Sequence, residues 1–175
     1  MIFLYFHGLN SDSNSRKYLN LKEYFQKEFE FDCLEWKNDD YISILLDNAE
    51  KNYENHEDLI LFGDSTGANF TYQLRERRKE KGLKSILILS SPLLDKSKRI
   101  ADFPFPKQLK KYLAKIENPE NAFIIAPEHD ELIDHSWLFK KTFKNTEILK
   151  VNDSHRLPNF KEYLPQIRDY INLES

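Results

Sequence analysis

A short motif, Gly63-Asp64-Ser65-Thr66-Gly67, separates an apolar run at 59–62 from a stretch at 68–81 that contains neither proline nor glycine. The run predicts a buried strand and the stretch predicts a helix, so the motif between them must make a tight turn. Glycine on both sides of Ser65 lets the strand and the helix approach without a Cβ clash. A G-x-S-x-G turn of this kind exposes a serine hydroxyl above the sheet edge as a nucleophile. The alternative is a serine that only caps the helix.

Composition narrows the class of protein. The 175 residues are 40% hydrophobic and 31% charged, as in ordinary globular proteins, and this length favours one domain spanning 1–175. A net charge of −3 gives no reason to expect a nucleic-acid or membrane partner. Cys33 is the only cysteine, which suits packing in a reducing compartment, and neither a secretory signal nor a bilayer-spanning stretch is visible. We therefore expect a cytoplasmic protein, whose oligomeric state the sequence leaves open.

Apolar strand-like runs alternate with helix-like segments along the chain. Strands are predicted at 2–6, 31–36, 58–62, 85–89, 121–126 and 146–151, and helices at 15–29, from Asp39 or Asp40 to 49, at 68–81, 106–116, 134–141 and 158–173. Pro165 is expected to restart or kink the last helix. The basic residues that end 68–81 are expected to form a solvated helix end. The alternation predicts an α/β fold, a three-layer sandwich around a mostly parallel six-stranded sheet.

Residues with catalytic chemistry follow several of the predicted strands. In open α/β sheets such residues gather at the carboxyl ends of the strands. Ser65 follows the third strand, Asp130 the fifth and His155 the sixth. The order serine, acid, histidine is that of α/β-hydrolases. We expect His155 to take the proton of Ser65 and Asp130 to hold the imidazole in the required tautomer.

Other carboxylates compete with Asp130 for the role of the acid. Asp134 is the first alternative, although it is more typical of a helix N-cap, and Glu128 and Asp153 are weaker candidates. The serine hydrolase chemistry also requires backbone N–H donors for an oxyanion. These are expected from Thr66, which follows the nucleophile, and from Leu9, in the loop after the first strand.

The residues around Leu9 and the remaining histidines have simpler interpretations. Gly8 should let the first loop fold over the serine, and His7 is expected to be structural. His56, His129 and His135 lack the spacing of metal ligands, and no G-x-G-x-x-G or Walker loop is present. We therefore expect neither a metal nor another cofactor.

Five segments of the chain resemble the small, cap-less α/β-hydrolases of the YqiA-like esterase type. These are 7–11 with 14–17, the motif around Ser65, the loop around Asp130, 153–155 and the tail 160–167. The resemblance covers essentially the whole chain and is most specific at the two ends. It implies the strand order 2-1-3-4-5-6, the absence of a large cap domain, and carboxylesterase activity on short acyl esters or thioesters. The sequence departs from this type at 68–69 and 90–92, near the expected acyl pocket.

The expected function is that of a serine hydrolase that cleaves a small acyl ester or thioester through an acyl-enzyme on Ser65. The segment 103–106, Phe-Pro-Phe-Pro, is expected to roof the acyl pocket. Two alternatives keep the same fold: a catalytically inactive binding protein, and an acyltransferase that uses the same triad with an acceptor other than water.

Overall fold

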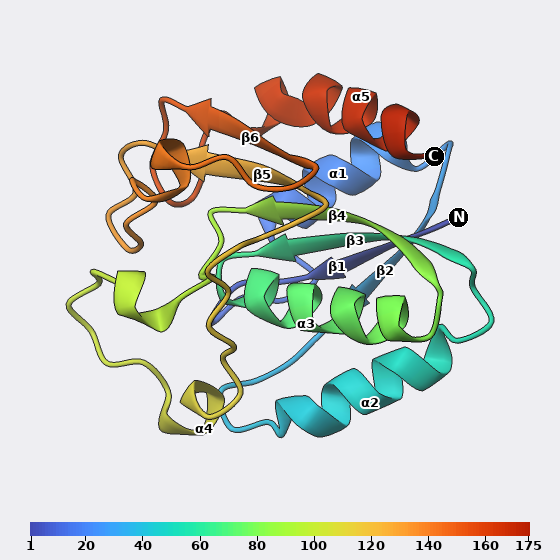
Figure 1. Ribbon diagram of the computed structural model, residues 1–175, viewed down its shortest axis with the longest axis horizontal. Helices are drawn as coiled ribbons and strands as arrows, with labels where there is room; N and C mark the ends of the chain where they lie inside the picture. Colours follow the sequence, from blue (N-terminus) through green and yellow to red (C-terminus); the bar gives the residue numbers. More distant parts are fainter.

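The computed structural model describes residues 1–175 and is built on a parallel sheet with helices on both faces (Figure 1). The strand order is β2-β1-β3-β4-β5-β6, the order that the family resemblance implies, and every neighbouring pair is parallel. The strands are β1 (Ile2–Phe6), β2 (Glu30–Leu34), β3 (Asp58–Asp64), β4 (Lys84–Ser90), β5 (Ala122–Pro127) and β6 (Thr146–Val151). All six carboxyl ends therefore meet at one edge of the sheet. The predicted three-layer α/β fold is confirmed.

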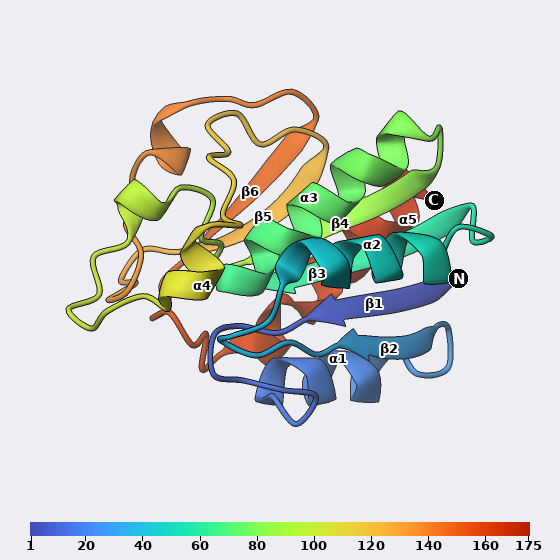
Figure 2. The ribbon, with the colours of Figure 1, turned by 90° about the horizontal axis from the view of Figure 1, so that it is seen from below.

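Two pairs of helices cover the sheet. One face carries α1 (Arg16–Phe25) and α5 (Leu164–Glu174), and the other carries α2 (Ile42–Asn52) and α3 (Thr66–Glu80) (Figure 2). Successive side chains of a strand point to opposite faces, so that Phe3 and Tyr5 pack under α1 while Leu4 and Phe6 pack under α2 and α3. The central strands are buried on both faces, which explains their unbroken apolar runs. None of the helices combines the length and apolar character needed to cross a membrane.

Helix ends agree with the sequence at some positions and differ at others. Ser15 caps α1 by accepting the N–H of Tyr18, and Pro165 lies in the first turn of α5, which it restarts. The prediction that Asp39 or Asp40 caps the next helix was wrong. Asp40 instead accepts the N–H of Lys37, and the helix begins after Tyr41.

The predicted helix at 106–116 is only one turn, α4 (Lys107–Lys110). The side-chain amide of Asn69 on α3 explains why it stops. Its oxygen accepts the N–H of Ala114, and its nitrogen donates to the carbonyl of the same residue. These bonds use backbone groups that a longer helix would need. The helix predicted at 134–141 is likewise a short 3₁₀ turn, Leu138–Lys140, and the one predicted at 15–29 ends at Phe25.

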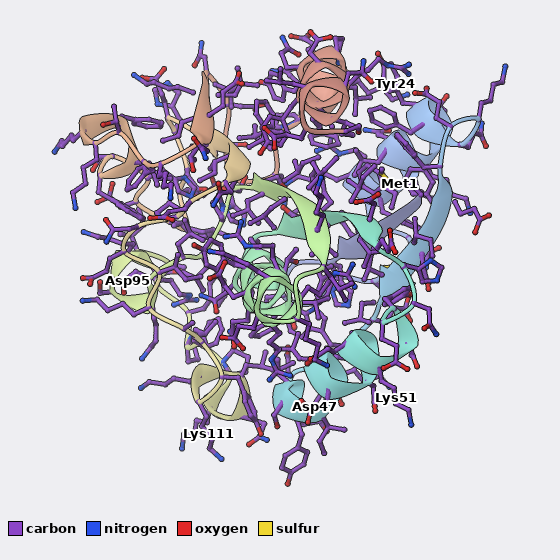
Figure 3. The ribbon with its side chains drawn as sticks, turned by 45° about the vertical axis from the view of Figure 1, so that its right-hand side comes forward. Met1, Tyr24, Asp47, Lys51, Asp95 and Lys111 are labelled. Atoms are coloured by element: carbon purple, nitrogen blue, oxygen red, sulfur yellow. The ribbon has the colours of Figure 1, made fainter.

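The basic end of α3 is not uniformly solvated, contrary to the sequence-based expectation. Arg78 is fully buried and donates hydrogen bonds to the carbonyls of Tyr53, His56 and Lys84. Arg75 is also buried. The neighbouring helix, by contrast, has a charged and exposed outer side, from which Asp47 and Lys51 project (Figure 3). Arg78 therefore closes the loops at the amino ends of β3 and β4, far from the strand ends that carry Ser65.

Candidate active site

Ser65 occupies a strained turn between β3 and α3. Its φ of 52° and ψ of −116° are unfavourable for a residue with a Cβ. Backbone hydrogen bonds hold it there: its N–H donates to Ser90 over 2.9 Å, and its carbonyl accepts from Leu93 over 3.0 Å. Its hydroxyl makes no capping bond to α3, so the helix-cap alternative does not describe this serine.

The glycines of the motif are required by close packing. A Cβ on Gly67 would lie 2.2 Å from the carbonyl oxygen of His7, and a Cβ on Gly63 would lie 2.5 Å from the Cα of Ala68. Both distances are far below a van der Waals contact. The start of α3 thus lies directly against the end of β1, which brings the loop after β1 onto the serine. A Cβ on Gly8 would be 3.3 Å from that of Ser65.

Ser65, His155 and Asp130 are joined by hydrogen bonds. Nε2 of His155 lies 2.9 Å from Oγ of Ser65, and Nδ1 of the same ring lies 2.8 Å from Oδ2 of Asp130. A carboxylate is an acceptor, so Nδ1 carries the proton and Nε2 presents its lone pair to the serine hydroxyl. The structure brings together the three residues that the sequence predicted as a triad.

Asp130 is held as a carboxylate. Its Oδ1 accepts the N–H groups of Leu132 and Ile133, each over 2.8 Å. Burial alone would raise the pKa of Asp130, but the hydrogen bond from His155 and the electrostatic interactions with the His155 and His135 rings outweigh it and lower that pKa below its ordinary value. The group is therefore ionised near neutral pH.

The competing acids lie in other interactions. Asp134 accepts the N–H of Ser136, Glu128 pairs with Lys150, and Asp153 accepts the hydroxyl of Tyr163. None of these three carboxylates has a hydrogen bond to His155.

A second histidine, His135, lies close to Asp130, and the sequence did not predict this contact. Nδ1 of His135 lies 3.4 Å from Oδ2 of Asp130 and has no hydrogen-bond partner, while Nε2 faces the carbonyl of Pro92 at 3.3 Å. The side chain is buried, and burial lowers the pKa of His135. No sequence spacing relates His135 to Asp130, since only the turn after β5 brings them together.

Two free backbone donors lie near the serine, one in the loop after β1 and one at the start of α3. The N–H groups of Leu9 and Thr66 make no hydrogen bond within the chain, and both residues line the cavity that contains Ser65.

His7 is structural, as expected. Its Nε2 accepts the N–H of Trp36 over 3.0 Å, its Nδ1–H donates to the carbonyl of Gly8, and its ring stacks on the indole at 4.8 Å.

The loop that carries His155 is fixed from two sides. Arg16 at the start of α1 donates to three consecutive carbonyls, those of residues 156–158. Ser91 donates its hydroxyl to the carbonyl of His155, and Glu131 accepts the N–H of His155. These contacts hold the imidazole against the serine without using its ring nitrogens.

Ser65 and His155 open into a cavity of about 610 Å³. Its apolar wall consists of Leu9, Leu93, Phe103, Phe105, Leu132 and Ile133. The two phenylalanines belong to the connection between β4 and β5, which extends beyond the carboxyl ends of the strands (Figure 1). The structure thus places the predicted Phe-Pro-Phe-Pro segment at the cavity. No cluster of three or more His, Cys, Asp or Glu side chains is arranged to hold a metal ion.

No protein-family model and no curated protein matches the chain. Solved structures do match it. Alpha/beta hydrolase domain-containing protein 10 from mouse superposes with a TM-score of 0.75 at 13% identity, over 99% of this chain and 90% of that one. Est1E from Butyrivibrio proteoclasticus gives 0.69 at 16% identity, over 99% and 87%. The RedJ thioesterase of the prodiginine pathway in Streptomyces coelicolor gives 0.68 at 12% identity, over 97% and 90%.

Identities this low show the fold and nothing finer. The chain has the α/β-hydrolase fold, in a small form without a cap domain.

Proposed function

We propose that the protein is a serine hydrolase that cleaves acyl esters or thioesters through a Ser65–His155–Asp130 triad. The observation that carries the proposal is the chain of hydrogen bonds from Ser65 through His155 to Asp130, with the serine on a strained turn at the mouth of a cavity. A serine hydroxyl is a poor nucleophile until a positioned base removes its proton. The 2.9 Å contact gives it that base.

In the first half of the proposed reaction, Oγ of Ser65 attacks the acyl carbon as its proton passes to Nε2 of His155. The tetrahedral oxyanion is stabilised by the N–H groups of Leu9 and Thr66, which have no other partner in the chain. The intermediate then collapses, the acyl-to-oxygen or acyl-to-sulfur bond breaks, and the imidazolium returns the proton to the departing alcohol or thiol. The carboxylate of Asp130 stabilises the imidazolium that forms meanwhile.

In the second half, a water molecule attacks the acyl-enzyme and gives its proton to His155. Collapse of the second tetrahedral intermediate releases the carboxylic acid and restores the proton to Ser65. The only reactants are the ester and water, so the scheme needs neither a metal nor a cofactor.

The preference for esters or thioesters rests on two lines of support. The apolar wall of the cavity suits an acyl chain. Among the proteins of similar fold, RedJ is named a thioesterase and Est1E has been solved with ferulic acid bound.

We further propose, from the motifs at the two ends of the chain, that the protein belongs to the YqiA-like esterase type. Its single cysteine suits the reducing cytoplasm.

The test is hydrolysis of a panel of 4-nitrophenyl esters from acetate to octanoate and of matching acyl thioesters. We expect turnover by the wild type and a loss of at least about 1,000-fold in kcat for Ser65→Ala. Ser136→Ala is the matched control, because this serine is exposed and does not line the cavity. Turnover that persists in Ser65→Ala, or a wild type inactive on the whole panel, would contradict the proposal.

A further inference from the structure

The cavity beside Ser65 carries an excess of positive charge. Four cationic side chains line it, Arg16, Lys17, Arg99 and Arg156, against two carboxylates, Asp64 and Glu131. The cavity thus has a surplus of two positive charges in a chain whose net charge is −3. A concentration of one sign in a cleft raises the local concentration of ligands of the opposite sign.

Most of these charged side chains already have a partner in the chain or are hydrated by solvent. Lys17 forms an ion pair of 2.6 Å with Asp64, and Glu131 accepts the N–H of His155. Both terminal nitrogens of Arg16 donate hydrogen bonds to backbone carbonyls of the loop that carries His155. Arg156 is exposed to solvent, where a guanidinium is well hydrated.

Arg99 differs from the other cations of the cavity. Its guanidinium forms no ion pair, and the only hydrogen bond of that side chain runs from Nη1 to the carbonyl of Ala101, over 3.1 Å. Its Nη2 is buried without any partner. The guanidinium stacks on the ring of Phe103 at 4.5 Å and lies 5.8 Å from that of Phe105, and both rings line the cavity.

The position of Arg99 is set by the backbone. The residue forms an antiparallel bridge with Ile133, and the next N–H, of Ile100, donates to the carbonyl of Leu132 over 2.9 Å. Leu132 and Ile133 are the residues whose N–H groups hold Asp130. Arg99 is therefore anchored to the same loop as the triad acid, on the cavity wall.

We propose that Arg99 binds an anionic group of the substrate, so that the ester or thioester cleaved at Ser65 carries a carboxylate or a phosphate. The inference rests on the proposed function and narrows its substrate class. An oxyanion in the cavity provides the counter-charge that the guanidinium lacks. Stacking on Phe103 fixes the plane of the guanidinium and its fork of N–H donors. Bidentate recognition of a carboxylate or phosphate depends on this fixed plane.

The anionic group could lie on either side of the scissile bond. A carboxylate at the far end of the acyl chain describes a half-ester of a dicarboxylic acid, and a phosphate on the leaving group describes an acyl thioester of a phosphorylated thiol. Two pairs of substrates separate these sources. The first is the 4-nitrophenyl half-ester of glutaric acid against 4-nitrophenyl valerate, and the second is S-butyryl-pantetheine 4′-phosphate against S-butyryl-pantetheine.

We expect the wild type to favour the anionic member of at least one pair by about 10-fold or more in kcat/KM, at low salt. In Arg99→Met, which keeps the length of the side chain but not its charge, the ratio of anionic to neutral kcat/KM should fall by about 10- to 100-fold. Arg99→Lys should retain part of it, because a charge remains but the fork is lost. Arg77→Met on α3 removes one positive charge outside the cavity and should leave both ratios unchanged.

Each outcome decides the matter. A wild type that hydrolyses the neutral esters but shows no anionic preference in either pair would overturn the inference and leave the proposed function intact. An anionic preference that survives in Arg99→Met would overturn the assignment to this residue. The wild-type ratios, and their decline as salt is raised from about 50 to about 500 mM, test the inference even where a variant does not fold. A wild type inactive on all four substrates and unreactive towards a fluorophosphonate would overturn the proposed function and the inference with it.

Discussion

Nζ of Lys17 lies 2.6 Å from Oδ1 of Asp64, the residue immediately before the proposed nucleophile, and the two side chains are only 7% and 15% exposed. The hydroxyl of Ser90, at the end of the neighbouring strand, donates to the same oxygen over 2.7 Å. The contact connects α1 with the ends of β3 and β4, directly next to Ser65. It therefore braces the strained turn from the side opposite to α3.

Breaking this pair should be costly. Asp64→Asn leaves the Lys17 ammonium nearly buried and without a counter-charge, and we expect a loss of about 3–5 kcal/mol in the free energy of unfolding. The exposed pair of Arg77 and Asp47 is the comparison, and Asp47→Asn should cost less than about 1 kcal/mol. Urea unfolding of both variants measures the difference. Equal stabilities for the two would show that the Lys17–Asp64 pair does not brace the turn.

The assignment of the triad acid can be tested with two isosteric variants. In Asp130→Asn the amide oxygen can keep the N–H bonds of Leu132 and Ile133, so the amide nitrogen must face His155. The imidazole is then driven into the tautomer with its proton on Nε2, which cannot accept from Ser65. We expect kcat on a reporter ester to fall by about 1,000- to 10,000-fold with little change in KM.

Asp134→Asn serves as the matched control, because Asp134 accepts the N–H of Ser136 and does not contact His155. Its kcat should stay within about twofold of the wild type. A larger loss in Asp134→Asn than in Asp130→Asn would reverse the assignment.

Gly67 tests the approach of α3 to the end of β1. In Gly67→Ala the new methyl group would meet the carbonyl oxygens of Phe6 and His7 at 2.6 and 2.2 Å. Both are backbone atoms of a buried strand end, so repacking of side chains cannot relieve the clash. We expect a loss of at least about 3 kcal/mol, measured by thermal unfolding.

Gly82→Ala provides a scale for that loss. Gly82 ends α3 with a φ of 76°, but no atom lies within 4 Å of the position that the new methyl group would take. Only backbone strain of about 1–2 kcal/mol is therefore expected. If Gly67→Ala were no worse than Gly82→Ala, the close approach would not exist in solution.

Stability should fall in mild acid because of His7. Burial lowers the pKa of this imidazole, although its bond to the Gly8 carbonyl opposes the shift, and protonation of Nε2 would break the bond from Trp36. In the unfolded chain the pKa returns to about 6.5. The unfolded state thus binds more protons just below that pH, and stability declines as the pH falls through this window.

Melting temperatures between about pH 8 and about pH 5.5 measure the effect. His7→Gln removes the titration and should flatten the slope in part, since burial lowers the pKa of His135 as well and that residue contributes with the same sign. His56→Gln, at an exposed position, should keep the wild-type slope. An unchanged slope in His7→Gln would contradict the role assigned to this histidine.

Local chemistry explains why much of the fold could be predicted from the sequence. The apolar strands, the cap at Ser15 and the turn at Ser65 depend on residues that are neighbours in the chain. The strand-end rule then places Ser65, Asp130 and His155 at one edge without knowledge of any distance. The strand order came from a family resemblance and not from periodicity.

The remaining features depend on contacts between distant segments. Arg78 is buried where four carbonyls, three of them more than twenty residues away, converge on its guanidinium. The helix expected at 106–116 is cut short by Asn69, some forty-five residues earlier in the chain. Only the structure shows that the guanidinium of Arg99 forms no ion pair. Residue spacing contains none of this information.

The most direct test of the proposed triad is reaction with a fluorophosphonate, followed by intact mass and peptide mapping. We expect the folded wild type to gain a single phosphonyl group, located on Ser65 and on no other of its serines. The adduct should be absent in Ser65→Ala, and it should form at least about 100-fold more slowly in His155→Ala, which lacks the base. A folded wild type that gains no adduct, or gains it at another residue, would contradict the claim that His155 activates Ser65.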